Sequence, residues 1–366
     1  MSGNRAKSQA KNQHTPKLKV GITIGDVNGI GPELIIKAFL DQRLKEVCIP
    51  IIYGSSRVIN IYRKVMKVNK FHYVVIQNPS QAQYKKLNII ECIPGLERVD
   101  IGKPSEIGGS AAHLSLKRAV EDAQHGEIDA LVTMPLDKAT MQQFVPEFTG
   151  HTELLAKAFN KEETLMFMIA EQLKVGTVTN HVAVKDISRN LSVERIVTKA
   201  RIMHDTLEND FSIQRPMIAI LGLNPHAGDR GLIGKEEEEF ISHAVTELKK
   251  SGIKAFGPYP ADGYFGALSY QKFHGTLSMY HDQGLIPFKL VTGFHGVNFT
   301  AGIPFIRTSP DHGVAYDIAG KGTADPASLR QALYWAIDIH QNRKMNAELK
   351  ENVLPSLEEL EERQEG

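Results

Sequence analysis

The chain has little cysteine, almost no net charge and no long apolar run, and each shortage excludes a class of protein. Its 366 residues contain two cysteines, Cys48 and Cys92, both in apolar stretches. We interpret them as buried thiols rather than a disulfide or a metal pair, which fits a reducing cytoplasm. The formal net charge is +1. A balance so close to neutral argues against nucleic acid or a membrane surface as the main partner.

The two ends of the chain differ in composition from the rest. Residues 1–17 are basic and polar and lack the apolar segment of a signal peptide, so we interpret them as a disordered leader. Residues 344–366 are interpreted as a charged tail. No run of about 18 apolar residues occurs anywhere, so the sequence predicts no transmembrane helix.

Length and hydrophobic pattern predict the fold class. A chain of 366 residues exceeds the usual limit for one core, so we expect two lobes with an active site between them. Short β-branched runs alternate with amphipathic stretches, a pattern typical of βαβ units on a mostly parallel sheet flanked by helices. The predicted strands are 19–24, 51–53, 130–133, 175–179, 217–221 and 276–279. The predicted helices are 32–40, 110–124, 153–159, 235–250 and 326–341.

Three histidines each stand where a predicted strand gives way to a loop. They are His181, His226 and His281. Imidazole binds zinc-like ions, and three such ligands leave one coordination position open for a substrate. A single loop histidine is more often a hydrogen-bonded surface residue. The three together, with Pro, Gly and Asp neighbours that fix the backbone, favour a catalytic divalent metal site.

Two glycine-rich segments precede predicted helices. The first, 25–33, allows backbone N–H groups to approach an anion. It lacks both the G-x-G-x-x-G order and the Walker lysine, so a plain strand-to-helix turn is about as well supported. The second, 311–326, ends in a proline-started helix and predicts a loop whose N–H groups face a ligand.

Polar residues in two further segments indicate an anionic substrate. His151 and Thr152 begin a predicted helix and offer an imidazole and a hydroxyl beside free backbone donors, although Thr152 alone would also serve as an N-cap. Lys289, Asn298 and Arg307 supply two cations and an amide and predict a phosphate clamp. If they were scattered over a surface, they would be ordinary solvated side chains.

In this order, the segments resemble the 4-hydroxythreonine-4-phosphate dehydrogenase family of vitamin B6 biosynthesis. The resemblance runs from about Leu18 to Gln341. It rests on Gly-Ile-Thr-Ile-Gly-Asp with Gly29–Glu33, on Gly150–Glu153, on Asn224–Gly228 and on the run from Met279 to Asp325. The loop 312–326 also looks like the coenzyme loop of isocitrate and isopropylmalate dehydrogenases, which share a fold with this family.

The resemblance implies a two-lobed isocitrate dehydrogenase-like fold with the active site in the cleft between the lobes. Residues 18–142 with 285–343 would form the coenzyme-side lobe, and 143–284 the metal and dimerisation lobe. A homodimer is implied, with metal ligands drawn from both subunits. NAD or NADP would bind the glycine loop, through His312, Gly313, Asp317, Gly320 and Gly322. The three histidines would hold zinc, cobalt or magnesium, and the five residues of the two polar segments would bind a small phosphorylated substrate.

The implied reaction is metal-dependent, NAD(P)-linked oxidation of 4-phosphooxy-L-threonine at C3. The 3-keto acid then decarboxylates to 3-amino-2-oxopropyl phosphate. Asp262, Asp282 and Lys138 are candidates for proton transfer or for orienting a ligand histidine, although Asp262 is equally consistent with an exposed turn aspartate.

Two departures from the family pattern leave the substrate open. Val27-Asn28 stand where many members carry Pro-Ala, and Asp137 stands where a histidine is common. They leave room for a paralogue that oxidises 4-phospho-D-threonate or 4-phospho-D-erythronate. Two other classes remain possible from the residues alone. A three-histidine metal hydrolase would bind no nicotinamide, and a phosphate acyltransferase would need no metal.

Overall fold

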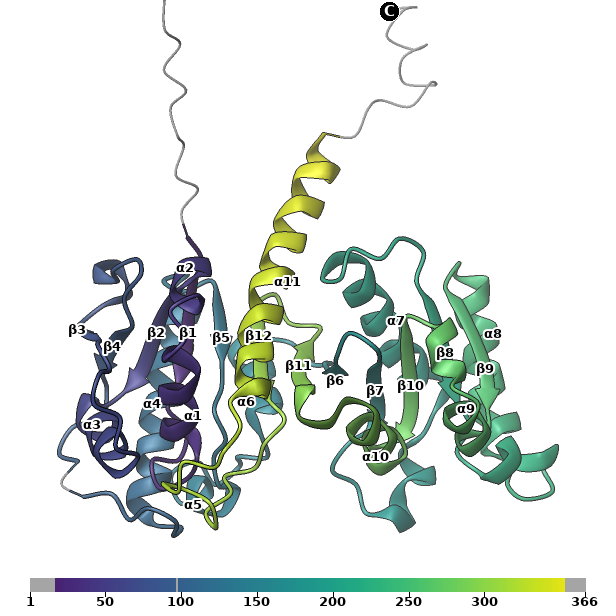
Figure 1. Ribbon diagram of the computed structural model, residues 1–366. Helices are drawn as coiled ribbons and strands as arrows, with labels where there is room; N and C mark the ends of the chain where they lie inside the picture. The colour runs from purple at the N-terminus through teal and green to yellow at the C-terminus, as the bar shows by residue number, and fades with distance from the viewer. Residues whose placement is uncertain (1–16, 97, 353–366) are drawn as a thin grey trace, which may run out of the picture.

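The computed structural model describes residues 17–96 and 98–352, and in them the chain forms one 12-stranded sheet with helices on both faces (Figure 1). The predicted leader, apart from Lys17, lies outside the described residues. In sheet order the strands are β3 (Val74–Ile76), β4 (Asn88–Glu91), β2 (Ile49–Gly54), β1 (Lys19–Thr23), β5 (Ala130–Val132), β12 (Ile306–Pro310), β11 (Val297–Ala301), β6 (Leu165–Ile169), β7 (Lys174–Thr179), β10 (Gly275–Tyr280), β8 (Met217–Leu221) and β9 (Lys254–Tyr259).

Helices connect most of these strands, as the alternation in the sequence predicts. They are α1 (Gly31–Phe39), α2 (Leu44–Val47), α3 (Ser56–Val65), α4 (Glu106–Gln124), α5 (Lys138–Gln142), α6 (His151–Ala158), α7 (Val193–Asn209), α8 (Ser242–Lys250), α9 (Ala261–Gly266), α10 (His281–Thr292) and α11 (Ala327–Glu351). Two short turns also matter for the site: η4 (Pro225–Asp229) and the π-helical turn η5 (Glu237–Ile241), which begins the helix predicted over 235–250.

The mostly parallel α/β architecture is confirmed. Every described strand pair is parallel except the three that involve β11 and β6. These two antiparallel strands join a half built around β1 to a half built around β10, seen at the left and right of Figure 1. The six predicted strands are all present, as β1, β2, β5, β7, β8 and β10.

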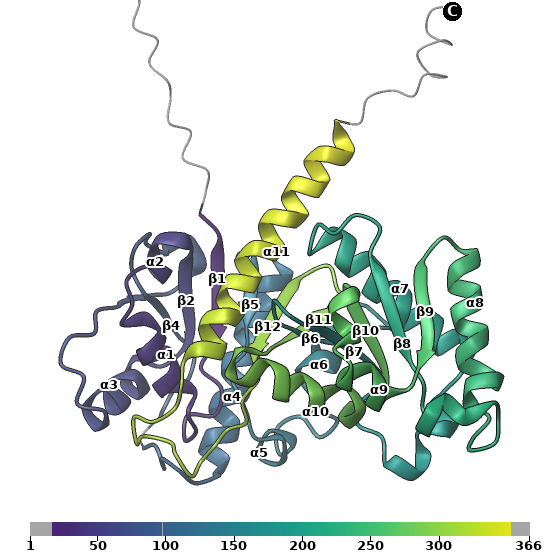
Figure 2. The same cartoon turned by 45° about the vertical axis from the view of Figure 1, so that its right-hand side comes forward.

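The two faces of the sheet are packed differently. One face carries a single apolar cluster that spans both halves, with Val20 and Phe39 at one end and Met203 and Ile218 at the other. The opposite face carries two separate clusters. One lies under α4 and α6, and the other lies under α9 and α10, which stand on the near side in Figure 2. Between these two clusters, β11 and β12 contribute polar side chains to the same face, among them Asn298, Thr300 and Arg307, so this stretch of the face is not apolar.

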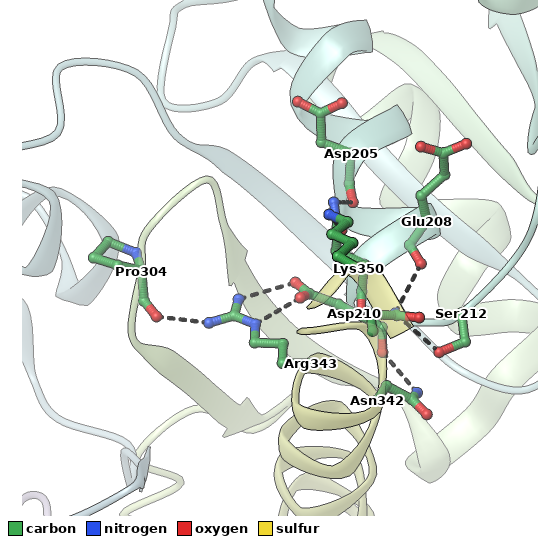
Figure 3. A network of polar contacts seen from close by, with 10 residues as sticks. Asp205, Glu208, Asp210, Ser212, Pro304, Asn342, Arg343 and Lys350 are labelled. Carbon is green, nitrogen blue, oxygen red and sulfur yellow. Dashed lines mark hydrogen bonds and ion pairs between the residues drawn. The ribbon is translucent and has the colours of Figure 1, made fainter. Parts of the chain in front are cut away.

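Helix α11 ties the two halves together. It packs on β12, β5 and β11 and runs to Glu351, beyond the predicted end at Gln341, so the first part of the predicted tail is helical. Its Arg343 guanidinium donates to both carboxylate oxygens of Asp210, at 2.6 and 3.0 Å, and to the carbonyl of Pro304 at 2.7 Å (Figure 3). Asp210 ends α7 of the other half, so this ion pair fixes the helix across the seam.

Both cysteines are free thiols, as predicted; Cys48 is buried and Cys92 is half-buried. Burial raises the pKa of each thiol to about 12, so neither is a reactive thiolate near neutral pH. Within residues 17–352, no helix combines the length and apolarity that a membrane crossing requires.

Candidate functional site

A polar cavity of about 250 Å³ lies over this polar stretch of the middle strands. Its floor comes from alternate residues of β12, β11 and β6, which share one face because side chains alternate along a strand. Asn298 pairs in register with Met168, and Thr300 pairs with Met166. Arg307 of β12 belongs to this floor. Loops and helices from both halves complete the lining, with Lys138, Gly150, His151, Thr152, Glu153, Asn180, His181, His281, Leu285, Lys289 and Asp311.

Arg307 is the buried cation of this cavity. Its side chain is held by two hydroxyls: Nε and Nη2 donate to Thr133 Oγ1 at 3.0 and 2.6 Å, and Nη1 donates to Thr300 Oγ1 at 3.1 Å. The residue is only 2% exposed, and among the described residues it forms no ion pair with a carboxylate. Burial lowers the pKa of Arg307 to about 9. It therefore stays charged at neutral pH, and an anion entering the cavity would compensate that charge.

Other polar groups of the cavity also face inward without full partners. The Asn298 side-chain oxygen is buried and has no hydrogen-bond partner among the described residues. Lys289 Nζ donates to Asp311 at 2.9 Å across the rim. A buried amide without a partner is rare in a folded protein and indicates a missing ligand or water. The structure thus brings together the three residues of the predicted clamp, Lys289, Asn298 and Arg307, in one cavity.

His151 and Thr152 line the same cavity at the start of α6. Burial, followed by the positive charges of Arg307 and Lys138, lowers the pKa of His151 well below 6.5. The imidazole is therefore neutral near pH 7, which suits a hydrogen bond to substrate rather than a charge on it. Thr152 Oγ1 lies 3.4 Å from Thr300 Oγ1 and so joins the hydroxyl group set around Arg307.

His181 and His281 lie side by side at the cavity wall. Each follows the carboxyl end of a parallel strand, β7 or β10, and their ring centroids are 6.3 Å apart. Asp282 Oδ1 lies 2.7 Å from His281 Nδ1, which leaves Nε2 free to bind. Burial lowers the pKa of His181, so its ring is neutral near pH 7, as a metal ligand must be. This pair fits two of the three ligands of a divalent metal.

The third predicted ligand, His226, lies elsewhere in the same chain. It follows β8 in η4 and does not line the cavity, and no group of three metal-binding side chains forms within residues 17–96 and 98–352. Asp262 lies in α9, which packs against η4, so it is also separated from the cavity. Of the proton-transfer candidates, Lys138 lines the cavity and Asp282 contacts His281. One chain therefore carries two separate partial sites.

The two glycine-rich segments are in contact with each other, which the sequence did not reveal. Glu33 of α1 is fully buried and accepts from the N–H groups of Gly320 and Ala324 at 3.1 and 3.0 Å. The Tyr316 hydroxyl donates to Asp26 at 2.6 Å, and burial raises the pKa of that carboxyl. The first segment is thus the support of the second rather than a ligand site.

The loop itself keeps groups available for a coenzyme. Gly313 has open space where a side chain would stand, and Asp317 and Gly322 are exposed. His312 Nε2 is buried without a partner among the described residues. By contrast, the Gly320 N–H already donates to Glu33 and is not available to a ligand. The other four residues, His312, Gly313, Asp317 and Gly322, are available to a nucleotide.

Sequence reasoning missed several residues of the site. Thr133, which directly follows β5, and Thr300, in β11, hold Arg307 but have no recognisable motif around them. Glu153 and Asp311 also line the cavity. Each is next to a predicted residue, in Gly-His-Thr-Glu and in Asp-His-Gly, and this position in the motif could have indicated them.

The fold and the site define the class of protein as an α/β dehydrogenase, which works with a nucleotide coenzyme and a divalent metal. The chain belongs to the family described as pyridoxal phosphate biosynthetic protein PdxA, whose family model matches residues 46–336. The resemblance seen in the motifs is confirmed, and with it the prediction of an oxidoreductase.

Individual relatives carry two different activities in their names. The chain is 44% identical to a 4-hydroxythreonine-4-phosphate dehydrogenase of Bacteroides thetaiotaomicron, covering 92% of this chain and 93% of that protein. It is 38% identical to a D-threonate 4-phosphate dehydrogenase of Cupriavidus necator, over 88% and 98%. A crystal structure of 4-hydroxythreonine-4-phosphate dehydrogenase from Klebsiella pneumoniae superposes with a TM-score of 0.80 at 32% identity, covering 90% and 99%.

Proposed function

We propose that this chain oxidises 4-phosphooxy-L-threonine at C3, with NAD(P) as oxidant and a divalent metal, to a 3-keto acid that decarboxylates to 3-amino-2-oxopropyl phosphate. The observation that carries the proposal is Arg307, a buried cation without a carboxylate partner, in one cavity with His181 and His281. The relatives in Bacteroides and Klebsiella support the substrate.

The roles follow from the positions. Arg307, Asn298 and Lys289 would bind the phosphate, so that its binding energy holds the reacting carbon in place. Neutral His151 and Thr152 would hydrogen-bond the polar groups nearer C3. Lys138 lies at the cavity wall, where it could exchange a proton with the substrate.

Bound at the histidines, a divalent metal would supply Lewis acidity at the C3 hydroxyl, while NAD(P) accepts the hydride. Three imidazoles suit zinc or cobalt better than magnesium, which prefers oxygen ligands. Asp282 would hold the His281 ring in the orientation that exposes Nε2. For the coenzyme we propose NAD, because the exposed carboxylate of Asp317 suits ribose hydroxyls and repels a 2′-phosphate.

The complete site requires a homodimer, because the two partial sites lie apart in one chain. Apolar side chains are exposed beside both of them. Ile286, Leu290 and Phe294 follow each other at four-residue intervals along α10 and its end, with Leu290 81% exposed. Leu232, also 81% exposed, stands just after η4. Burying these side chains against a second copy would place the partner's half-site on the cavity.

Mixing of inactive subunits tests this arrangement. His226→Ala and His281→Ala chains, each inactive alone, are unfolded together and refolded. In random mixing, half of the dimers are mixed and each has one intact site of two, so about a quarter of the wild-type activity should return. If both ligands act within one chain, no activity returns.

A second candidate substrate is 4-phospho-D-threonate, favoured by the relative in Cupriavidus and by the departures at Val27 and Asn28. The deciding measurement is NADH absorbance with both compounds and with 4-phospho-D-erythronate, with and without a chelator. Chelator-sensitive NADH formation from the amino substrate alone supports the main proposal. Reaction with a threonate or erythronate alone moves the assignment to a paralogue, and no reaction with any of them favours the hydrolase.

We further propose a cytoplasmic enzyme with no nucleic-acid or membrane partner. The free thiols Cys48 and Cys92 suit a reducing compartment. The net charge of +1 leaves no general attraction to polyanions.

A further inference from the structure

The turn that carries His226 has an unusual backbone. Five consecutive residues, His226 to Arg230, have positive φ values of 55°, 51°, 79°, 42° and 56°. Only one of them, Gly228, is a residue that adopts this region without steric cost. Such a run persists only where surrounding groups hold it, and backbone strain of this kind gathers at functional sites.

Glu237 is the most buried carboxylate that holds the turn; its half-buried neighbour Glu236 also accepts from Asn224 Nδ2, at 2.8 Å. The Glu237 carboxylate is only 3% exposed. Oε1 accepts from the backbone N–H groups of Leu223 and Asn224 at 2.7 and 2.8 Å, and Oε2 accepts from Asn224 Nδ2 at 2.9 Å. The Asn224 carbonyl in turn accepts from Ala227 N–H at 3.0 Å. A chain of hydrogen bonds therefore leads from Glu237 into the first residues of the turn.

The local sequence is built to admit this carboxylate. A side chain at Gly228 would bring its Cβ within 2.6 Å of Glu237 Oε2, and one at Gly222 would come within 3.0 Å of Oε1. Glu237 also begins the π-helical turn η5, and its neighbours Glu238 and Glu239 are exposed while it is buried. A π turn inside a helix often marks a functional position.

The Glu237 carboxylate is buried without a cation to balance it within the described part of the chain. Among the described residues, Glu237 makes no ion pair, so its charge is balanced by N–H donors alone. Burying a carboxylate in this way is costly unless the hydrogen bonds are well formed. This burial occurs where Glu237 contacts the residues just before the turn that carries His226. The His226 ring must have one fixed orientation if it is to complete a metal site.

We infer that Glu237 is a positioning residue for the metal site: by fixing the left-handed turn, it presents the His226 imidazole in the orientation that binds the metal across the dimer interface. The inference rests on the proposed function, because it needs His226 to be a ligand. Glu237 itself touches neither substrate nor metal.

The test measures Zn²⁺ affinity of the intact dimer by competition with a chromophoric chelator. Glu237→Ala should weaken binding about 10- to 100-fold, the usual loss when a group supporting a ligand is removed. Glu237→Gln, which keeps one acceptor oxygen, should recover part of this loss. The exposed neighbour supplies the matched control, and Glu239→Gln should bind Zn²⁺ like the wild type. The visible spectrum of bound Co²⁺ should change in Glu237→Ala, because the ligand geometry changes.

A second variant covers the case in which Glu237→Ala fails to fold. Gly228→Ala keeps the carboxylate but forces it away from the turn, so it should also weaken Zn²⁺ binding. The inference is overturned if the folded variants among Glu237→Ala, Glu237→Gln and Gly228→Ala bind Zn²⁺ like the wild type while His226→Ala does not. If His226→Ala also binds normally, the proposed metal site is what fails.

Discussion

Two arginines in this protein are removed from water in opposite ways. Arg343 joins α11 to the end of α7 and donates to both oxygens of Asp210 and to a backbone carbonyl (Figure 3). Arg307 is more deeply buried, yet its partners are the hydroxyls of Thr133 and Thr300. The first arginine contacts its carboxylate directly. The second contacts none among the described residues, and only the Glu153 carboxylate, elsewhere in the same cavity, partly offsets its charge. A buried cation without an ion-pair partner lowers the stability of the folded protein, but it can bind an anionic ligand tightly.

The largest expected effect comes from removing the unpaired cation. Arg307→Met should lower kcat/KM about a thousandfold, equivalent to ~4 kcal/mol, because the substrate phosphate loses its buried charge partner. The free energy of unfolding of the ligand-free protein should stay equal or rise, since an uncompensated charge has been removed. Steady-state kinetics and denaturant unfolding measure the two effects. A large loss of stability with activity retained would reverse the comparison.

The paired arginine should behave in the opposite manner. Asp210→Ala leaves Arg343 without its carboxylate, and we expect the free energy of unfolding to fall by about 3 kcal/mol, near the lower end for a broken buried pair. The loss is moderated because the Arg343 side chain is 24% exposed and can be rehydrated. Urea unfolding checks the value. The folded variant should keep kcat/KM within about threefold of the wild type, because the pair lies outside the cavity.

An anion without the rest of the substrate sharpens the contrast. Inorganic phosphate at a hundred times its dissociation constant should stabilise the wild type by about 2.7 kcal/mol, since it binds only the folded state. Arg307→Met should lose this stabilisation and Asp210→Ala should keep it. Thermal unfolding with and without phosphate, at constant ionic strength, provides the measurement. Equal stabilisation of the wild type and Arg307→Met would place the anion elsewhere.

The smallest effect concerns the neutral imidazole beside Arg307. Because burial holds the pKa of His151 well below 6.5 in the folded protein, the unfolded chain binds more protons when the pH falls below 6.5. Stability from this residue is therefore complete above pH 6.5 and is lost below it, by at most about 1.4 kcal/mol per pH unit. His151→Gln should flatten the curve of unfolding free energy between pH 6.5 and 5. Superimposable slopes for the two proteins would contradict the assignment.

The sequence predicted the residues of the site better than their grouping. The clamp residues Lys289, Asn298 and Arg307 do meet in one cavity, and His181 and His281 stand together at its wall. These residues lie in segments whose motifs can be recognised in the sequence. His226 and Asp262 lie in equally recognisable segments, but neither lines that cavity. A local sequence pattern cannot indicate this, because the cavity is formed by segments far apart in the chain.

Other features had no local signal at all. The antiparallel strands β11 and β6, which form the cavity floor, were not among the predicted strands. The assignment of lobe boundaries stays a prediction. The extension of α11 beyond Gln341 contacts Asn209, the last residue of α7, and Asp210, which caps it. The composition of this segment is helix-prone but could not indicate these distant contacts.

The sequence by itself determined the periodicities that make an α/β sheet and the residue types of the candidate phosphate and metal site. These are properties of short segments and of the residue types themselves. Only the tertiary structure decided which charges have partners. Arg307 and Arg343 look alike in the sequence, and what separates them is whether the fold brings a distant carboxylate into direct contact, as it brings Asp210 to Arg343.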